Sequence, residues 1–381
     1  MTAASARARL TRGSLYVGAL LGPFGGGVVA AILPEIGASF AVSPSVAASA
    51  LTAYLVPFAA LMLVSGTLGE RWGQARTIRL AYVVYAVAAV GAALAPWFWL
   101  FQVTRGVQGC ANAFTLPLLM AKLAEGTPQA RLGRALGLFG AMQAVGQTSA
   151  PLVGGLAAEA SWRWAFAGIA LVGAVLAACP LPPDQAQDAS RPTRLRDSWR
   201  RDVLLPGLVG LVGWACLSGV SFLVAFRLED AFGLSSGLRG LVLTGFGVAG
   251  ILTARVVGGV NDRYGPRPSA VTGLVAGALL LAAIGFVDSL AVAAACWAVA
   301  GFCGQLIMVA INSSVLSGGE RGRGGAISVV QAMRFVGMAA APAAFTAPYH
   351  HAAALGFGLP AALLLLVTPL TVVLRRTRSR G

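Results

Sequence analysis

Long apolar segments alternate along the chain with short polar, glycine-containing or proline-containing breaks. A helix needs about 20 apolar residues to cross a bilayer. Such segments are expected at residues 15–33, 46–68, 78–94, 97–123, 132–157 and 164–179, and again at 204–226, 237–257, 269–287, 290–316, 325–347 and 353–374. The first should stop at Pro34. The pattern therefore predicts an all-α membrane protein with about twelve transmembrane helices.

Composition supports this prediction. Of the 381 residues, 57% are hydrophobic and only 11% are charged, whereas a soluble domain has about 25% charged residues. Twelve crossings use nearly the whole length and leave no room for a soluble domain. A net charge of +15 would suggest a nucleic-acid partner in a soluble protein. Here the arginines gather in loops, so we expect the lipid bilayer, and no nucleic acid, as a partner.

Signatures of other chemistry are missing from the sequence. The five cysteines form no C-x-x-C pair and fall in or beside apolar segments, so we interpret them as small core residues and expect no metal site. There is no G-x-x-x-x-G-K-[ST] motif for ATP. HExxH is absent as well, and no GxSxG is followed by a plausible His and Asp. We therefore expect neither an enzyme nor a bound cofactor.

The arginines also predict the orientation of the chain. One side of the predicted topology holds Arg76, Arg79, Arg131, Arg134, the arginines of residues 180–201, Arg263, Arg267, Arg321, Arg323 and those after residue 374. The loops of the other side hold only Arg163, Arg227 and Arg239. Because cytoplasmic loops carry the excess of basic residues, both termini should be cytoplasmic. The first apolar segment has no convincing cleavage site and is expected to be an uncleaved span.

One polar stretch divides the chain. Residues 180–201 are rich in proline, aspartate and arginine, unlike the apolar sequence on either side. We expect an N-terminal six-helix bundle at residues 1–179, a cytoplasmic linker at 180–201 and a C-terminal six-helix bundle at 202–381.

The two halves share sequence features at a constant spacing. The turn containing Glu70, Arg71 and Gly73 returns as Asp262, Arg263 and Gly265, each 192 residues later (262 − 70, 263 − 71, 265 − 73). Met142, Gly146 and Pro151 return 191 residues later as Met333, Gly337 and Pro342. Both halves therefore run in the same direction, as a parallel repeat, which predicts a site between two bundles.

The first turn, from Gly66 to Arg76, resembles the loop pattern G-x-x-x-(D/E)-R-x-G-x-(R/K)-(R/K) of the major facilitator superfamily. Gly66 is expected to let neighbouring backbones come close, and Gly73 to permit a left-handed turn. Gln74 and Ala75 stand where the family often has basic residues. The resemblance implies that the turn and its copy gate conformational change. The residues expected in this gate are Gly66, Glu70, Arg71, Gly73, Asp262, Arg263 and Gly265.

The fourth segment is similar to the family pattern R-x-x-Q-G-x-(G/A)-x-A, through Arg105, Gln108 and Gly109. In relatives this arginine is linked to proton coupling, and the resemblance implies that role here. A charge inside a membrane is costly, so Arg105 should face the bundle interior or a water-filled cavity. The alternative is an arginine whose head reaches the membrane interface.

The fifth segment resembles the antiporter pattern G-x-x-x-G-P-x-x-G-G. Gly146, Pro151, Gly154 and Gly155 match it, whereas Ala150 replaces one glycine. In the family this signature accompanies export. The alternative is that the small residues serve only ordinary helix packing.

Polar residues elsewhere in the apolar segments are candidates for a substrate cavity. They are Tyr54, Asn112, Gln143, Gln147, Asn312, Gln331 and Arg334. Taken singly, each of these residues is explained as well by a hydrogen bond between helices as by a place in a substrate cavity. All thirteen acids fall in loops or at predicted span ends. Without a carboxylate near Arg105 and Arg334, an anionic or neutral amphipathic substrate is expected, and proton coupling stays open.

Together these features predict a secondary active transporter that exports a small amphipathic molecule by alternating access. The resemblance is to the bacterial drug-exporter branch, which implies a monomer in the bacterial inner membrane. Two alternatives stay open: an importer or facilitator of small organic anions, and a non-transporting membrane receptor or assembly factor on the same fold.

Overall fold

The computed structural model describes residues 3–184, 201–317 and 323–374. This part of the chain contains thirteen α-helices, one short 3-10 helix and no strand. The first half comprises α1 (Ala3–Phe40), α2 (Pro44–Trp72), α3 (Gln74–Leu94), α4 (Phe98–Glu125), α5 (Gln129–Ala160) and α6 (Arg163–Ala178). The second comprises α7 (Arg201–Cys216), α8 (Ser221–Asp230), α9 (Ser236–Tyr264), α10 (Pro266–Phe286), α11 (Leu290–Ser317), α12 (Arg323–His351), α13 (Ala353–Val367) and η2 (Thr368–Val373).

The thirteen helices of the described chain correspond to twelve crossings. Helices α7 and α8 form one apolar span of 30 residues, Arg201–Asp230, that is interrupted between Cys216 and Ser221. By length and hydropathy alone, eight described spans could cross a membrane, or nine when the bent α1 is included. Helix α6 has only 16 residues, and α4 and α5 do not meet the same criterion. The lower apolarity of α4 follows from charged residues such as Arg105 and Lys122.

The repeat seen in the sequence appears in the helices themselves. Helices α9, α10 and α11 begin 192 residues after α2, α3 and α4 (236 − 44, 266 − 74, 290 − 98). Each pair also has equal lengths of 29, 21 and 28 residues. The prediction of an all-α fold with two six-crossing halves in parallel repeat is confirmed.

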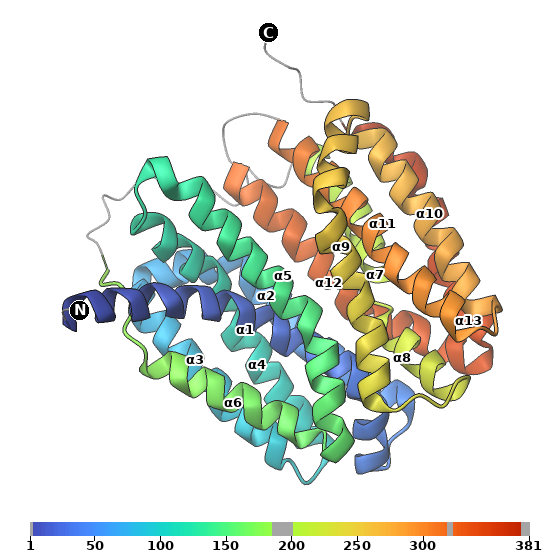
Figure 1. Cartoon of the computed structure of the whole chain (residues 1–381), viewed down its shortest axis with the longest axis horizontal. Helices are drawn as coiled ribbons and strands as arrows, with labels where there is room; N and C mark the ends of the chain where they lie inside the picture. Colours follow the sequence, from blue (N-terminus) through green and yellow to red (C-terminus); the bar gives the residue numbers. More distant parts are fainter. Residues whose placement is uncertain (1–2, 185–200, 318–322, 375–381) are drawn as a thin grey trace.

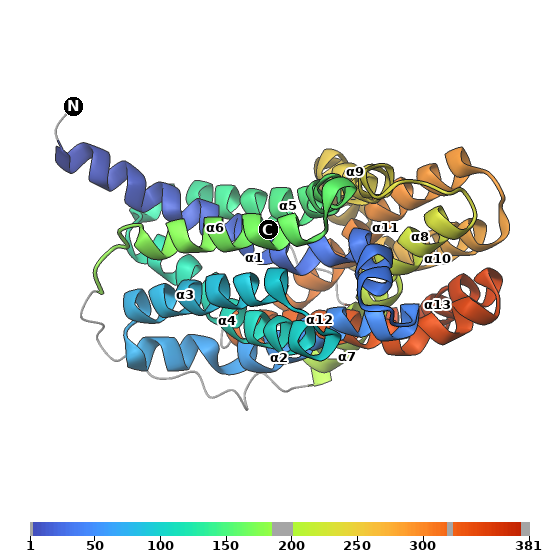
Figure 2. The same cartoon turned by 90° about the horizontal axis from the view of Figure 1, so that it is seen from below.

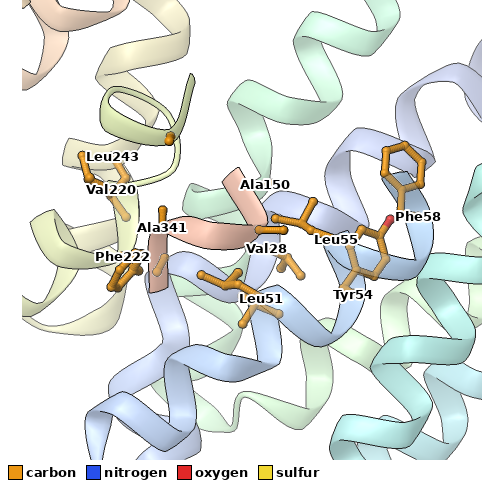
Figure 3. Packing of buried hydrophobic residues seen from close by; sticks show 14 of the residues in the cluster. Val28, Leu51, Tyr54, Leu55, Phe58, Ala150, Val220, Phe222, Leu243 and Ala341 are labelled. Atoms are coloured by element: carbon orange, nitrogen blue, oxygen red, sulfur yellow. The ribbon is translucent and has the colours of Figure 1, made fainter. Parts of the chain in front are cut away.

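The halves form two groups of helices that meet along a seam. Figure 2 shows α3, α4 and α6 together in one group and α10, α11 and α13 in the other. Across the seam, α5 packs against α9, and α2 packs against α12. Buried apolar side chains from both halves form one continuous cluster there. Figure 3 shows Leu51, Leu55 and Ala150 of the first half in this cluster with Leu243 and Val220 of the second.

The two ends of the seam differ. The end of α5 lies beside the start of α9, and the two helices then diverge toward the start of α5 and the end of α9 (Figure 1). We call the end where α5 finishes and α9 begins the Arg239 end. The opposite end, which carries the α2–α3 and α9–α10 turns, is called the Gly73 end.

Helix α1 corrects one prediction. It does not stop at Pro34 but continues to Phe40. A proline removes one backbone hydrogen bond, which a membrane helix can tolerate when neighbouring groups satisfy the freed carbonyl. The sharp bend, 46°, lies instead between Gly27 and Val29, after three consecutive glycines that weaken the helix there.

The seam generates a prediction about the separated halves. If the chain is cut within residues 185–200, the two pieces should still insert and copurify, because the contacts between α5 and α9 and between α2 and α12 do not depend on that segment. Affinity purification through a tag on one piece measures this. A cut inside α5 serves as the control and should abolish recovery of the partner piece. Inserted halves that never copurify would contradict the two-bundle arrangement.

Candidate functional site at the seam between the halves

A cavity of about 130 Å³ lies at the seam. Its wall is built from α1, α2 and α5 on one side and from the α7–α8 region, α9, α11 and α12 on the other. The lining residues include Gly26, Gly27, Leu51, Leu55, Gln147, Thr148, Pro151, Trp214, Ser218, Gly219, Leu243, Phe246, Gly247, Trp297, Gln305 and Met338. None of the lining residues carries a charge. The wall is therefore apolar and aromatic, with a few amide and hydroxyl groups.

Both helix interruptions meet this cavity. Gly27 lies at the bend of α1, and Ser218 and Gly219 lie in the break between α7 and α8. A side chain at Gly219 would collide with the Ala215 carbonyl oxygen, 2.5 Å from the Cβ position. Irregular backbone at membrane depth is tolerated where it is buried in protein or lines a cavity. Broken helices around a site between two repeats are the usual construction of a transporter binding site.

Small residues let α5 and α9 approach more closely than ordinary side chains allow. A Cβ at Gly240 would lie 2.2 Å from the Pro151 carbonyl oxygen, and one at Gly155 would lie 2.2 Å from the Ser236 carbonyl oxygen. A Cβ at Gly247 would be 2.2 Å from the Thr148 hydroxyl oxygen. These contacts join the two halves along the seam, because close backbone packing is a main source of helix association in lipid.

The segment resembling the antiporter pattern occupies the centre of this packing. A Cβ at Gly146 would lie 2.2 Å from the Leu20 carbonyl oxygen, and one at Gly154 would lie 2.8 Å from that of Val28. These two glycines therefore face α1, whereas Pro151 and Gly155 face α9 of the other half. Gln147 lines the cavity between them. The role of this segment in export stays a prediction, and its position between α1 and α9 is compatible with it.

An ion pair crosses the seam at the Arg239 end. Arg239 of α9 is buried and pairs with Glu35 of α1. Its guanidinium also lies 3.2 Å from a carboxylate oxygen of Glu229 and donates to the Leu234 carbonyl at 3.0 Å. Close by, the Gly237 backbone N–H donates to the Glu159 carboxylate of α5 at 2.8 Å. Two acids of the first half thus bind the start of α9.

Sequence reasoning placed Arg239 and Glu35 at span ends without giving them a function. Nothing in the sequence pairs two residues that are 204 positions apart. One weak feature of the sequence pointed to an ion pair. Arg239 is one of only three loop arginines on the side with few basic residues, and an isolated charge there is consistent with a specific acidic partner.

Arg105 lies inside the first bundle and does not line the cavity of the seam. Its Nη1 donates to the Gly25 carbonyl of α1 at 3.2 Å and to Gln108 Oε1 at 2.8 Å. The guanidinium also stacks on the Tyr54 ring at 4.3 Å. Carbonyl, amide and aromatic groups therefore surround this cation, and Arg105 holds α4 against α1 next to the bend. Its predicted coupling role stays a prediction.

Several predicted cavity residues belong to the same polar network. Asn112 donates to the Tyr54 hydroxyl at 2.7 Å, and that hydroxyl donates to the Gly22 carbonyl at 3.3 Å. Both side chains are buried. A Cβ at Gly109 would lie 2.1 Å from the Tyr54 carbonyl oxygen, so this glycine lets α4 pack closely on α2. Tyr54 and Asn112 thus lie behind the cavity wall formed by Leu51 and Leu55.

Arg334 lies nearer to the cavity than Arg105. Its guanidinium stacks on the Trp214 ring at 3.7 Å, and Trp214 lines the cavity. Gln331 accepts a hydrogen bond from the Arg334 guanidinium, within α12. Gln143 and Asn312 are half-buried and do not belong to the cavity wall. Of the seven residues predicted for the cavity, the structure places Gln147 on its wall.

The two predicted gate turns each contain a glycine with positive φ. Gly73 ends α2 with a φ of 88°, and Gly265 ends α9 with a φ of 93°, a region that favours glycine. The close approach expected at Gly66 is not seen among the described residues, none of which has an atom within 4 Å of its Cβ position. A Cβ at Gly69, in contrast, would lie 2.5 Å from Leu118 Cδ1. Arg71, Asp262 and Arg263 are exposed, and the Glu70 side chain lies outside the described part of the structure.

A buried lysine ties the Gly73 end to the start of the predicted linker. Lys122 of α4 is buried and lies 2.8 Å from the Asp184 carboxylate. The Ala75 backbone N–H donates to the same carboxylate at 3.0 Å. Desolvation raises the pKa of Asp184, but the hydrogen bond from Lys122 and that from Ala75 outweigh it and lower the pKa below its usual value. The Asp184 carboxylate therefore links α4 to the start of α3.

A comparison with protein families identifies the chain. The sequence model of the Major Facilitator Superfamily matches residues 15–342 and, in a second match, residues 207–381. The chain belongs to the major facilitator superfamily. The superfamily is one of membrane transporters, so the chain is a multi-pass membrane protein of a transporter family and not an enzyme.

Curated relatives agree with this assignment. The chain is 26% identical over 46% of its length to the uncharacterized MFS-type transporter YfiU of Bacillus subtilis, of which it spans 35%. It is 28% identical over 51% of its length to the drug efflux pump JefA of Mycobacterium tuberculosis, of which it spans 38%. The chain therefore spans about a third of the length of these two superfamily relatives.

Solved transporter structures share the fold of this chain. A bacterial homolog of the human lysosomal transporter Spinster, in an inward-facing and occupied conformation, has a TM-score of 0.80 at 16% identity, with 96% of each chain covered. A D-xylose-proton symporter has a TM-score of 0.78 at 16% identity, with 98% of this chain and 99% of that one covered. Each likeness covers nearly the whole of both chains, so it applies to the complete fold.

The close contact of α5 with α9 generates a first prediction for the site. Replacing Gly240 by Val puts a branched side chain where a Cβ alone would lie 2.2 Å from the Pro151 carbonyl oxygen. We expect a lower Tm of the purified protein, because such overpacking costs about 1–3 kcal/mol. Gly168→Val on α6 is the control, since no atom of the described residues lies within 4 Å of its Cβ position. An unchanged Tm in Gly240→Val would show that the seam is not closely packed.

The ion pair generates a second prediction. Arg239→Gln should destabilise the protein, because removing one partner of a buried pair leaves the other charge uncompensated, at a cost of about 3–5 kcal/mol when burial is complete. The double variant Arg239→Gln/Glu35→Gln should recover part of this loss. Thermal unfolding of the wild type, both single variants and the double variant measures the coupling between the two residues.

Arg227→Gln provides the control for that cycle. Arg227 pairs with Asp288 within one half, and the Asp288 side chain is 88% exposed, so its loss should cost about 1 kcal/mol or less. Purely additive effects of Arg239→Gln and Glu35→Gln would contradict a stabilising pair across the seam.

Proposed function

We propose that the chain is a secondary active transporter that exports a small amphipathic molecule by alternating access. One observation carries the proposal: an uncharged cavity at the seam is flanked on one side by close α5–α9 packing and the Arg239–Glu35 pair. Two repeats that enclose a site, with one end held shut, are what alternating access requires. The likeness to a protein named as a drug efflux pump and the segment from Gly146 to Gly155 favour export.

The proposed orientation puts the Gly73 end in the cytoplasm of a bacterium, with the chain as a monomer in the inner membrane. The Gly73 end carries most of the loop arginines, including Arg76, Arg131 and Arg267, and cytoplasmic loops carry the excess of basic residues. The Arg239 end then faces outward. The structure corresponds in this orientation to a state held shut on the outside, in which the site can be loaded only from the cytoplasm.

The transition to the other state would separate α5 from α9 at the Arg239 end. The Arg239–Glu35 and Gly237–Glu159 contacts then break, and water solvates the released charges. The desolvation cost of a buried pair nearly offsets its attraction, so such a pair can stabilise one state without locking it. In the proposed cycle the turns at Gly73 and Gly265, with Glu70, Arg71, Asp262 and Arg263, close the opposite end.

The cavity wall suggests the class of substrate. Trp214, Trp297 and Phe246 offer aromatic surfaces, and Gln147 and Gln305 offer amide groups. Arg334 sits directly behind Trp214. Because the wall carries no charge and the nearest charge behind Trp214 is positive, a neutral or anionic amphipathic molecule fits better than a cation. A volume of about 130 Å³ is small for a ligand pocket, which typically has about 300–1,000 Å³, so the halves must part to admit the substrate.

An importer or facilitator of small organic anions is the second candidate. The observation that favours it is the charge distribution: Arg105 and Arg334 are buried, one in each half, and the cavity wall contains no acid. The fold does not choose between the two directions, since it also serves a proton-coupled sugar symporter.

Transport into inside-out membrane vesicles tests the direction. We expect vesicles with the chain to accumulate neutral or anionic fluorescent amphiphiles when energised, and vesicles without it to accumulate none. Uptake only in right-side-out vesicles would favour the importer. Preferential accumulation of lipophilic cations would contradict the proposed substrate class.

Arg334→Ala tests the role of the charge behind Trp214. We expect anionic substrates to bind roughly tenfold more weakly to this variant, which corresponds to loss of one interaction with a charged group of about 1.5–3 kcal/mol. Binding to purified protein measures it, and Arg134→Ala, an exposed position on α5, is the control. Unchanged affinity in a folded Arg334→Ala protein would assign Arg334 to helix packing instead.

A further inference from the structure

A second cavity lies on the first half alone, away from the seam. It has a volume of about 700 Å³ and lies between the end of α2, the start of α3 and the middle of α4, at the Gly73 end. We call it the α2–α4 groove. Arg71 and Arg76 lie at its rim, and Trp72, Leu80, Val84 and Phe114 supply most of its apolar wall.

The α2–α4 groove opens toward the surroundings of the bundle. Trp72 and Leu80 are 56% and 61% exposed. Beyond Leu80, the exposed face of α3 continues as a stripe of apolar side chains that includes Val87 and Leu94. In a membrane protein such a stripe faces the acyl chains of lipids. The groove is therefore continuous with the hydrocarbon of the bilayer and unconnected with the cavity of the seam, with which it shares no residue.

The rim of the groove carries two positive charges, those of Arg71 and Arg76. No described carboxylate is paired with Arg71 or Arg76. Asp184 lies nearby, 3.0 Å from the Cβ position of Gly73, but it is already bound by Lys122 and by the Ala75 backbone N–H. Both guanidiniums are exposed. A ligand with an anionic head and an apolar tail would match the rim and the wall at once.

We propose that the α2–α4 groove binds one anionic phospholipid. Its phosphate lies on Arg71 and Arg76, and one acyl chain runs along Leu80, Val84 and Phe114. A planar guanidinium matches a phosphate with two parallel hydrogen bonds. Trp72 stacks near Phe114 at 5.9 Å between ring centroids and stands at the level of the headgroups, where tryptophan concentrates in membrane proteins. The bound lipid bridges the end of α2 and the start of α3, the turn that contains Gly73.

Lipid binding to the purified protein tests this proposal. Native mass spectrometry compares retention of dioleoyl phosphatidylglycerol with that of dioleoyl phosphatidylcholine, which has the same acyl chains and no net charge. Phosphatidylglycerol should bind roughly 25-fold more tightly, because each of the two arginines near the membrane surface strengthens the attraction to anionic lipid about fivefold. The double variant Arg71→Gln/Arg76→Gln should lose this preference.

Arg79→Gln is the matched control. Arg79 is exposed on α3 one turn beyond Arg76 but does not line the groove, so its loss should leave the preference in place. Cys110 lies in the groove wall, and Cys110→Phe should reduce binding of both lipids while the arginines remain. Excess inorganic phosphate should fail to displace phosphatidylglycerol, since it lacks the acyl chain.

Three outcomes would overturn the site. Equal retention of the two lipids by the wild type would show that the charge of the headgroup does not contribute to binding. An effect of Arg79→Gln as large as that of the double variant would show general attraction to a basic surface. Displacement by inorganic phosphate would show an anion site without a lipid tail. None of these results depends on what the protein transports. The lipid site is therefore tested independently of the proposed function.

Discussion

The approach of α5 to α9 is the contact on which the rest of the arrangement depends. Inside a bilayer the hydrophobic effect does not drive two apolar helices together, because the lipid tails are as apolar as the helices. Close van der Waals contact and hydrogen bonds must therefore hold them. Gly155, Gly240 and Gly247 provide that contact by removing the side chains that would keep the backbones apart. The same closeness brings Arg239 against Glu35 and forms the wall of the cavity. Seam, ion pair and cavity are therefore consequences of one packing surface.

The buried arginines show how the chain offsets charge without acids. Arg105 relies on a carbonyl, an amide and the face of Tyr54. Arg334 relies on Gln331 and the face of Trp214. Aromatic faces and amide dipoles stabilise a cation only partly, and each arginine keeps at least one nitrogen without a hydrogen-bond partner within the described chain. The interior of each half is consequently electropositive, which is the physical basis for disfavouring cationic substrates.

Much of the fold could be predicted because hydropathy and repeat spacing report local properties. The alternation of apolar segments with polar breaks predicted twelve crossings, and the return of Gly73 as Gly265 predicted two turns that each need a glycine with positive φ. The prediction for α1 failed because a proline specifies one missing hydrogen bond and not the end of a helix. The sequence could not show that Gly66 has no close neighbour among the described residues, because close approach depends on which helix lies opposite, and that is a property of the assembled bundle.

The candidate site was harder to predict for the same reason. Gln147 was found because a polar side chain in an apolar segment is conspicuous. Trp214, Trp297 and Phe246 were missed because an aromatic residue in a membrane helix looks like any other apolar residue. Arg239 and Glu35 were missed as a pair because their contact exists only when the two halves pack together.

The equal spacing of the two halves has a consequence for how such a chain tolerates change in length. Trp297 stands 192 residues after Arg105 (297 − 105), at the same position of the matching helix. Arg105 faces α1 and α2, and Trp297 donates to the Leu243 carbonyl of α9 at 3.1 Å. One inserted residue within either helix would turn everything beyond it by about 100° around the axis. That rotation would take the arginine away from Gly25 and Tyr54, or the indole away from the Leu243 carbonyl, so the packing should tolerate a change in length far better in a turn than within either helix.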